Sequence, residues 1–187
     1  VNAAIDRDEL AVAFQPVISR DSTIMSVEAL IRWSHPSLGI VGANHLRAAA
    51  IGSEGMRDID EWMLRRAVGQ IAKWEHVLPV SAYISVNISD RSIAHPAVVD
   101  IILDLLDRHA VDPARLGIEY DHSAIEREPE TALRSLSRLA ESGVRLVLDD
   151  FGSARSSLGH LEATPLACVK LDARALHELV ARADEEA

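Results

Sequence analysis

The feature that most constrains this sequence is an alternation of strand-like and helix-like segments from residue 57 onward. Apolar residues recur every three or four positions over 57–77, which is the spacing of one helix face, and Pro79 is expected to end that helix. Strands are then predicted over 82–88, 116–120, 144–148 and 168–171, and helices over 97–110, 131–142, near Ser156 and over 174–183. Strands joined through helices run parallel, so the pattern predicts an α/β fold with a parallel sheet.

The first 33 residues follow a different pattern. Segments 11–19 and 24–33 are rich in β-branched and aromatic residues and are separated by the turn-forming run Arg20-Asp21-Ser22. This pattern predicts a hairpin-like pair of strands. No linker or low-complexity stretch interrupts the chain, so we expect one domain over residues 1–187.

Composition excludes several classes of protein. The chain has 29 acidic and 19 basic residues, a net charge of −10, which disfavours a protein that coats DNA or RNA or lies on anionic lipid. No segment reaches the roughly 18 apolar residues of a membrane span. Cys168 is the only cysteine, so no internal disulfide is possible and a reducing cytoplasm is expected. The chain starts at Val1 without an initiator methionine, so we expect it to belong to a longer protein with a flanking signalling domain.

Polar residues stand at or near the carboxyl ends of successive predicted strands, the edge where parallel α/β folds bind ligands. They are Glu28, Asn87, Glu119, Asp149, Asp150, Lys170 and Asp172. Contributions from so many strands favour a ring, as in a barrel, over a single switch point. A closed eightfold barrel needs about 200 to 250 residues, so we expect this chain to lack its last one or two βα units.

Oxygen donors dominate this set and suit hard cations such as Mg²⁺ or Mn²⁺, with Lys170 balancing the charge. Two such cations could activate a water and neutralise a phosphoryl oxygen, as in many phosphodiesterases. Each residue alone has an ordinary alternative. Glu28 could be a salt-bridge partner, Asn87 a turn residue, the Asp149-Asp150 pair a strand exit and helix cap, and Lys170 a partner of Asp172.

Six segments in order resemble the motifs of the EAL family of bacterial cyclic di-GMP phosphodiesterases. They are 14–17 (FQPV), 27–33 (VEALIRW), 85–89 (SVNIS), 116–119 (LGIE), 148–152 (LDDFG) and 169–172 (VKLD). The resemblance implies a TIM-like barrel with an aberrant first strand and a site that opens cyclic di-GMP to linear pGpG with two divalent metals, Mg²⁺ or Mn²⁺.

The same resemblance assigns roles to individual residues. It implies that Glu28, Asn87, Glu119 and Asp149 ligate metal and that Asp150 helps to hold the second metal. Lys170 and Glu28 are the expected catalytic residues, with Lys170 positioning the attacking water. Gln15, Arg32 and Asp172 are expected to contact the nucleotide.

Some segments depart from the family pattern. His122 replaces an acidic residue that restrains the loop after the aspartate pair, that loop reads SARSS over 153–157, and 42–54 lacks the usual proline and acidic pair. The family's later EGVE motif and its final glutamine-glycine strand have no counterpart before Ala187. Because of these departures, two alternative functions remain: a non-catalytic receptor for cyclic di-GMP and a protein-interaction module. The departures also keep open a homodimer in which open sheet edges pair.

Overall fold

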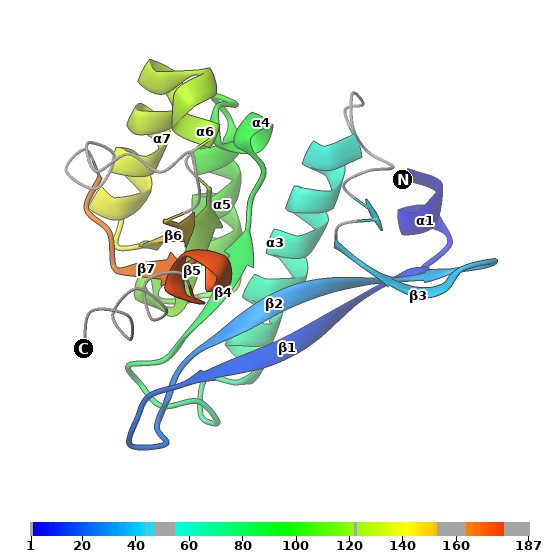
Figure 1. The fold of residues 1–187 in the computed structure, drawn as a ribbon, viewed down its shortest axis with the longest axis horizontal. Coiled ribbons are helices and arrows are strands. Elements are labelled where there is room, and N and C mark those ends of the chain that lie inside the picture. The colour runs from blue at the N-terminus through cyan, green and yellow to red at the C-terminus, as the bar shows by residue number, and fades with distance from the viewer. Residues whose placement is uncertain (1, 44, 47–54, 122, 153–163, 178–187) are drawn as a thin grey trace.

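A computed structural model of the chain describes all residues except 1, 44, 47–54, 122, 153–163 and 178–187 (Figure 1). Its strands are β1 (Leu10–Ile18), β2 (Ile24–His35), β3 (Gly39–Gly42), β4 (Tyr83–Asn87), β5 (Leu116–Tyr120), β6 (Arg145–Phe151) and β7 (Cys168–Leu171). Its α-helices are α1 (Asn2–Asp6), α3 (Gly55–Lys73), α4 (Asp90–Ile93), α5 (Val98–Arg108), α6 (Ser123–Arg127) and α7 (Pro129–Glu141). A 3₁₀ turn, η1 (Pro113–Arg115), precedes β5.

The strands form one sheet in the order β1-β2-β4-β5-β6-β7, with β3 paired to β2 beside this path. β1 and β3 run antiparallel to β2, whereas every step from β2 to β7 is parallel. Among the described residues no hydrogen-bonded ladder joins β1 to β7, so the sheet is open there. The α/β fold with an antiparallel first strand is therefore confirmed.

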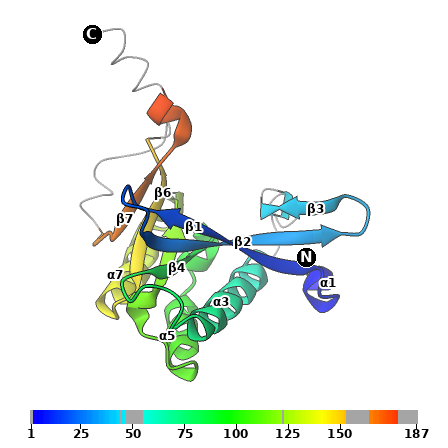
Figure 2. The same cartoon turned by 90° about the horizontal axis from the view of Figure 1, so that it is seen from below.

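Helices cover one face of the sheet (Figures 1 and 2). The core between the layers contains fully buried aliphatic residues from every central strand, such as Ile84, Ile118 and Leu146, facing Val68 and Ile102 from the helices. In the central strands β4 and β5 the core residues alternate with polar or small residues, such as Ser85, Asn87 and Glu119, which point away from the helices. The other face of the sheet is free to carry polar side chains.

Local signals explain where the helices begin and end. The Ser89 hydroxyl accepts the Ser92 amide proton at the start of α4, and Pro129 is the first residue of α7. Gly143, after α7, has a φ of +92°, a left-handed conformation that glycine adopts without strain.

Most predicted elements are present with shifted ends. The helix predicted over 57–77 ends as α3 at Lys73, because Val77 and Leu78 both donate to the Trp74 carbonyl, in tight turns. β3 and the short helices α1, α4 and α6 were not predicted, since each is too short for a periodic pattern. The helix predicted near Ser156, the end of the one predicted over 174–183, His122 and the 153–157 loop lie outside the described residues.

Among the described residues, no helix combines the length and the apolar character needed to cross a bilayer. Cys168 is a free, half-buried thiol at the start of β7.

Candidate functional site

The strand register brings four of the predicted residues onto one face of the sheet. Asn87 of β4 lies directly opposite Glu119 of β5, and Glu28 of β2 lies opposite Ser85, two residues before Asn87. In β7 the exposed Val169 and Leu171 flank Lys170, and because side chains alternate along a strand, Lys170 points to the opposite face, toward the carboxylates. Residues separated by up to 142 positions in the chain therefore meet at the carboxyl edge of the sheet.

Lys170 is the centre of this cluster. Its Nζ donates to Glu28 Oε2 and to Glu119 Oε2, both at 2.8 Å, and lies 3.7 Å from Asp149 Oδ1. The Glu119 side chain is 3% exposed, and that of Lys170 is 30% exposed. One ammonium group thus bridges carboxylates from three other strands.

Asn87 links the same two glutamates from the β4 side. Its Nδ2 donates to Glu28 Oε1 at 3.0 Å and to Glu119 Oε2 at 3.2 Å. Each glutamate therefore receives a hydrogen bond from the amide and another from the lysine, so the cluster behaves as one network.

Burial and charge shift the acidity of the cluster. Burial raises the pKa of Glu119 despite the hydrogen bond from Lys170, and burial also raises the pKa of Asp149. For Lys170, burial lowers the pKa, but hydrogen bonds to Glu119 and Glu28 and the charge of Asp149 outweigh this effect and raise the pKa overall. We therefore take Lys170 as the fixed positive charge of the site, and Glu119 and Asp149 as the carboxyl groups that hold their protons more tightly than usual.

A bulge at the end of β6 separates the two adjacent aspartates. Leu148 pairs with Val169, and Phe151 pairs with Leu171. Between these two pairs, β6 advances by three residues and β7 by two, so β6 has one extra residue. Asp149 faces Lys170, whereas Asp150 is exposed and has a φ of +53°, in the left-handed region. Asp150 thus lies at the rim of the cluster.

The three residues predicted to contact a nucleotide lie around this cluster. Gln15 is exposed on β1 directly opposite Glu28, and Arg32 lies four residues beyond Glu28 on the same face of β2. The Arg32 Nη1 donates to the Ile31 carbonyl at 2.9 Å. Asp172 follows β7, and its Oδ1 accepts the amide protons of residues 174 and 175, which is a helix-capping role.

The side chains of this cluster suit hard divalent cations. Three carboxylates and one amide offer oxygen ligands, and a single ammonium does not balance the carboxylate charge. As arranged, however, the described residues contain no group of three or more His, Cys, Asp or Glu side chains in a metal-holding geometry. The ammonium of Lys170 and the amide nitrogen of Asn87 point at the carboxylate oxygens instead.

The sequence analysis did not single out Ser85 as a site residue. Ser85 is 1% exposed, on the polar face opposite Glu28, and its buried hydroxyl has no hydrogen-bond partner among the described residues. The signal that could have found it is strand periodicity, because Ser85 lies two residues before Asn87 and so shares its face.

An open α/β sheet with one antiparallel first strand and an oxygen-rich edge defines a TIM-barrel-like class of domain. The model of the EAL domain family matches residues 1–187, and the chain therefore belongs to the EAL domain family.

Named relatives carry cyclic di-GMP activities. The chain is 32% identical over 185 residues to the bifunctional diguanylate cyclase/cyclic di-GMP phosphodiesterase MucR of Pseudomonas aeruginosa, covering 98% of this chain and 27% of MucR. It is 29% identical over 170 residues to the cyclic di-GMP phosphodiesterase NbdA of the same organism, covering 90% of this chain and 22% of NbdA. The chain spans about a quarter of the length of these relatives, which are larger proteins.

Solved structures agree with this assignment. A complex of the P. aeruginosa MucR phosphodiesterase with cyclic di-GMP has a TM-score of 0.88 and 31% identity, covering 99% of this chain and 75% of that one. The P. aeruginosa FimX EAL domain bound to cyclic di-GMP has a TM-score of 0.81 at 20% identity, covering 99% and 79%, and shows the shared fold alone.

Proposed function

We propose that this domain binds cyclic di-GMP at the carboxyl edge of its sheet and hydrolyses it to linear pGpG. The observation that carries the proposal is the convergence of Glu28, Asn87, Glu119 and Asp149 on Lys170. The printed activities of MucR and NbdA support the same substrate.

Charge explains why such a site needs cations. Three carboxylates surround one ammonium and Asp150 adds a fourth at the rim, so a substrate with two phosphodiester charges meets a net negative edge. Glu28, Asn87, Glu119 and Asp149 would hold two Mg²⁺ or Mn²⁺ ions, with Asp150 helping to hold the second. When bound, these ions would lower the pKa of a water and neutralise charge on the phosphoryl oxygens.

The chain's own residues supply orientation and charge. Lys170 is held by carboxylates from three strands, so its ammonium can position the attacking water and stabilise the negative charge that develops on phosphorus-bound oxygen. The water oxygen bonds to phosphorus as the bond from phosphorus to the ribose 3′ oxygen breaks; one water proton ends on this 3′ oxygen as a hydroxyl group and the other is released from the new terminal phosphate. Gln15, Arg32 and Asp172 are proposed to contact the nucleotide around the cluster.

The test is incubation of the protein with cyclic di-GMP and Mn²⁺, with pGpG measured by chromatography. Glu28→Gln keeps the side-chain shape but removes the charge, and it should lower turnover on the order of 100-fold or more. Glu130→Gln, at an exposed position of α7, is the matched control and should leave turnover unchanged. Equal turnover in the two variants would contradict the role of this site.

A receptor without turnover is the second candidate. Lys170 and Asn87 already satisfy Glu28 and Glu119, and His122 stands where the resemblance expects an acidic residue. Nucleotide binding measured by calorimetry with Ca²⁺, together with no pGpG in the presence of Mn²⁺, would favour the receptor. No binding under either condition would leave a protein-interaction module.

We also propose that the protein is cytoplasmic and that it forms a homodimer in which open sheet edges pair. Among the described strands, β1 and β7 lie at the two ends of the sheet, and no hydrogen-bonded ladder joins them. Analytical ultracentrifugation should show a mass that doubles with rising concentration. A monomer at every concentration would contradict the dimer.

A further inference from the structure

A second buried carboxylate lies outside the site. Among the described residues, Asp60 and Glu119 are the carboxylates classed as buried, and Asp60, on α3, is 5% exposed. A buried carboxylate is costly unless hydrogen bonds compensate its charge, so its partners indicate what it does.

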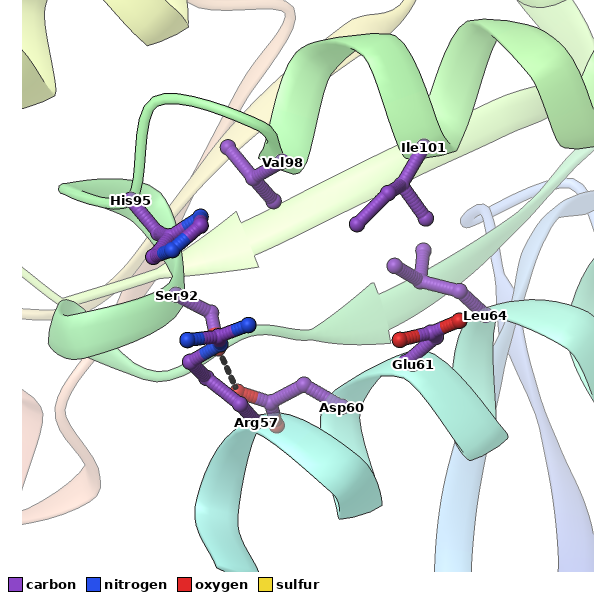
Figure 3. A pocket seen from close by; sticks show the side chains of 8 residues that line it. All are labelled: Arg57, Asp60, Glu61, Leu64, Ser92, His95, Val98 and Ile101. Atoms are coloured by element: carbon purple, nitrogen blue, oxygen red, sulfur yellow. Dashed lines mark hydrogen bonds between the residues drawn. The ribbon is translucent and has the colours of Figure 1, made fainter. Parts of the chain in front are cut away.

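Asp60 is bonded to the turn that follows β4. Its Oδ2 accepts hydrogen bonds from the Ser89 amide at 3.0 Å, the Ser89 hydroxyl at 2.5 Å and the Ser92 hydroxyl at 2.7 Å. Figure 3 shows the bond between Asp60 and Ser92 across the space between α3 and α4. Helix α3 and the amino end of α4 are thus joined through one carboxylate oxygen.

The pocket around Asp60 does not suit a ligand. It is lined by residues of α3, α4 and α5, including Arg57, and by His95 between α4 and α5, and it has a volume of about 30 Å³ (Figure 3). A single water molecule occupies about this volume in the liquid, whereas small-molecule sites have volumes of ~300 Å³ or more. The buried charge is therefore directed to the protein's own groups, the Ser89 amide and the hydroxyls of Ser89 and Ser92.

The bonded turn leads directly to the candidate site. Ser89 lies two residues after Asn87, and the intervening Ile88 amide donates to the Glu119 carbonyl at 2.9 Å. The backbone after Asn87 is thus held by β5 through Ile88 and by α3 through Ser89. These two anchors leave little freedom for the direction in which the Asn87 amide points.

We propose that Asp60 is a positioning residue that acts through Ser89 to orient the Asn87 side chain toward Glu28 and Glu119. Loss of the carboxylate frees the Ser89 anchor and lets the amide turn away from the two glutamates. Mutation of a residue that holds a metal ligand in position commonly weakens metal affinity by ~10- to 100-fold. We expect a loss of this size when Asp60 is replaced.

The experiment compares Asp60→Asn with Glu61→Gln, a change at the neighbouring residue of α3, which pairs with Arg65 at the surface. Affinity for Mn²⁺ is measured by calorimetry, the side-chain amide signals of Asn87 by NMR, and stability by urea unfolding. Asp60→Asn should weaken Mn²⁺ binding ~10- to 100-fold and shift the Asn87 signals. Glu61→Gln should leave both within about twofold of the unchanged protein.

Two further variants separate positioning from folding. Ser92→Ala removes one bond to Asp60 but keeps Ser89 anchored, so it should lower stability without moving the Asn87 signals. If Asp60 acts through Ser89, adding Ser89→Ala to Asp60→Asn should cost no more Mn²⁺ affinity than the worse single variant. Loss of stability in Asp60→Asn with unchanged Asn87 signals would overturn the proposal, and so would additive losses in the double variant.

The Mn²⁺ measurement rests on the proposed function, but the NMR measurement does not. If the unchanged protein bound no Mn²⁺, the proposed function would fail. The Asn87 signals would still decide for or against Asp60.

Discussion

Replacing Lys170 with methionine tests whether one ammonium group holds the site together. At an effective dielectric constant of about 20, a charge pair at 2.8 Å attracts by ~6 kcal/mol and a pair at 3.7 Å by ~4.5 kcal/mol. Desolvation of the ions offsets most of the gross attraction of ~16 kcal/mol, and breaking a buried pair costs ~3–5 kcal/mol in practice. Because the Lys170 side chain is 30% exposed, we expect Lys170→Met to lower the free energy of unfolding by ~2–4 kcal/mol near neutral pH.

The pH dependence makes this prediction specific. Without the ammonium, Lys170 no longer opposes the effects of burial and of the Glu28 charge, so Glu119 and Asp149 retain protons to higher pH in the native state than in the unfolded chain. The native state then binds more protons than the unfolded state above about pH 4.5, so stability rises as pH falls into that window. The loss caused by Lys170→Met should therefore be largest near about pH 8 and shrink toward about pH 5.

Urea unfolding over this pH range is the assay. The chain has only one other lysine, the exposed Lys73, so Lys73→Met is the matched control and should change stability by no more than about 0.5 kcal/mol. Equal losses in the two variants, or a loss in Lys170→Met that does not change with pH, would refute the reasoning.

Three further predictions use other parts of the structure. The raised pKa of Lys170 stabilises the native state fully below pH 10.5, and this stabilisation is lost as pH rises through the native pKa, so alkaline urea titrations should show a loss that Lys170→Met lacks. Gly117→Ala places a Cβ 2.7 Å from a tyrosine ring and should cost ~1–3 kcal/mol in urea unfolding, whereas Gly69→Ala in α3 meets nothing closer than 3.9 Å and should gain up to ~1 kcal/mol. Tyr120→Phe removes a buried hydrogen bond to Thr164 and should lower the thermal midpoint by an amount equivalent to ~1 kcal/mol; an unchanged midpoint would count against that bond.

Periodic and chemically marked segments were predictable from the sequence. The strand expected over 116–120 is β5 as observed, because a short apolar run follows the turn-forming Asp112-Pro113 pair. The meeting of Glu28 with Lys170 follows from parallel strands ending at one edge, although 142 positions separate the two residues.

Features set by tertiary context were not predictable in the same way. β3 is a four-residue run between glycines that pairs only because β2 continues to His35. The β6 bulge leaves no mark in the pattern, so the different directions of Asp149 and Asp150 required the structure. Asp60 was not predicted, although it is a charged residue within the buried stripe of α3, and such an interruption is readable from sequence.

The β6 bulge has a consequence for insertions and deletions. Removing one residue from a regular strand turns every later side chain to the opposite face. Here Asp150 is the extra residue. A chain without it would pair the phenylalanine with Leu171 in an unbroken ladder, and the residues before and after the deletion would stay on their present faces of the sheet. One position near the end of β6 thus tolerates a change of length as a loop does, and a relative with a single-residue gap there would retain the whole sheet and lose only a carboxylate at the rim.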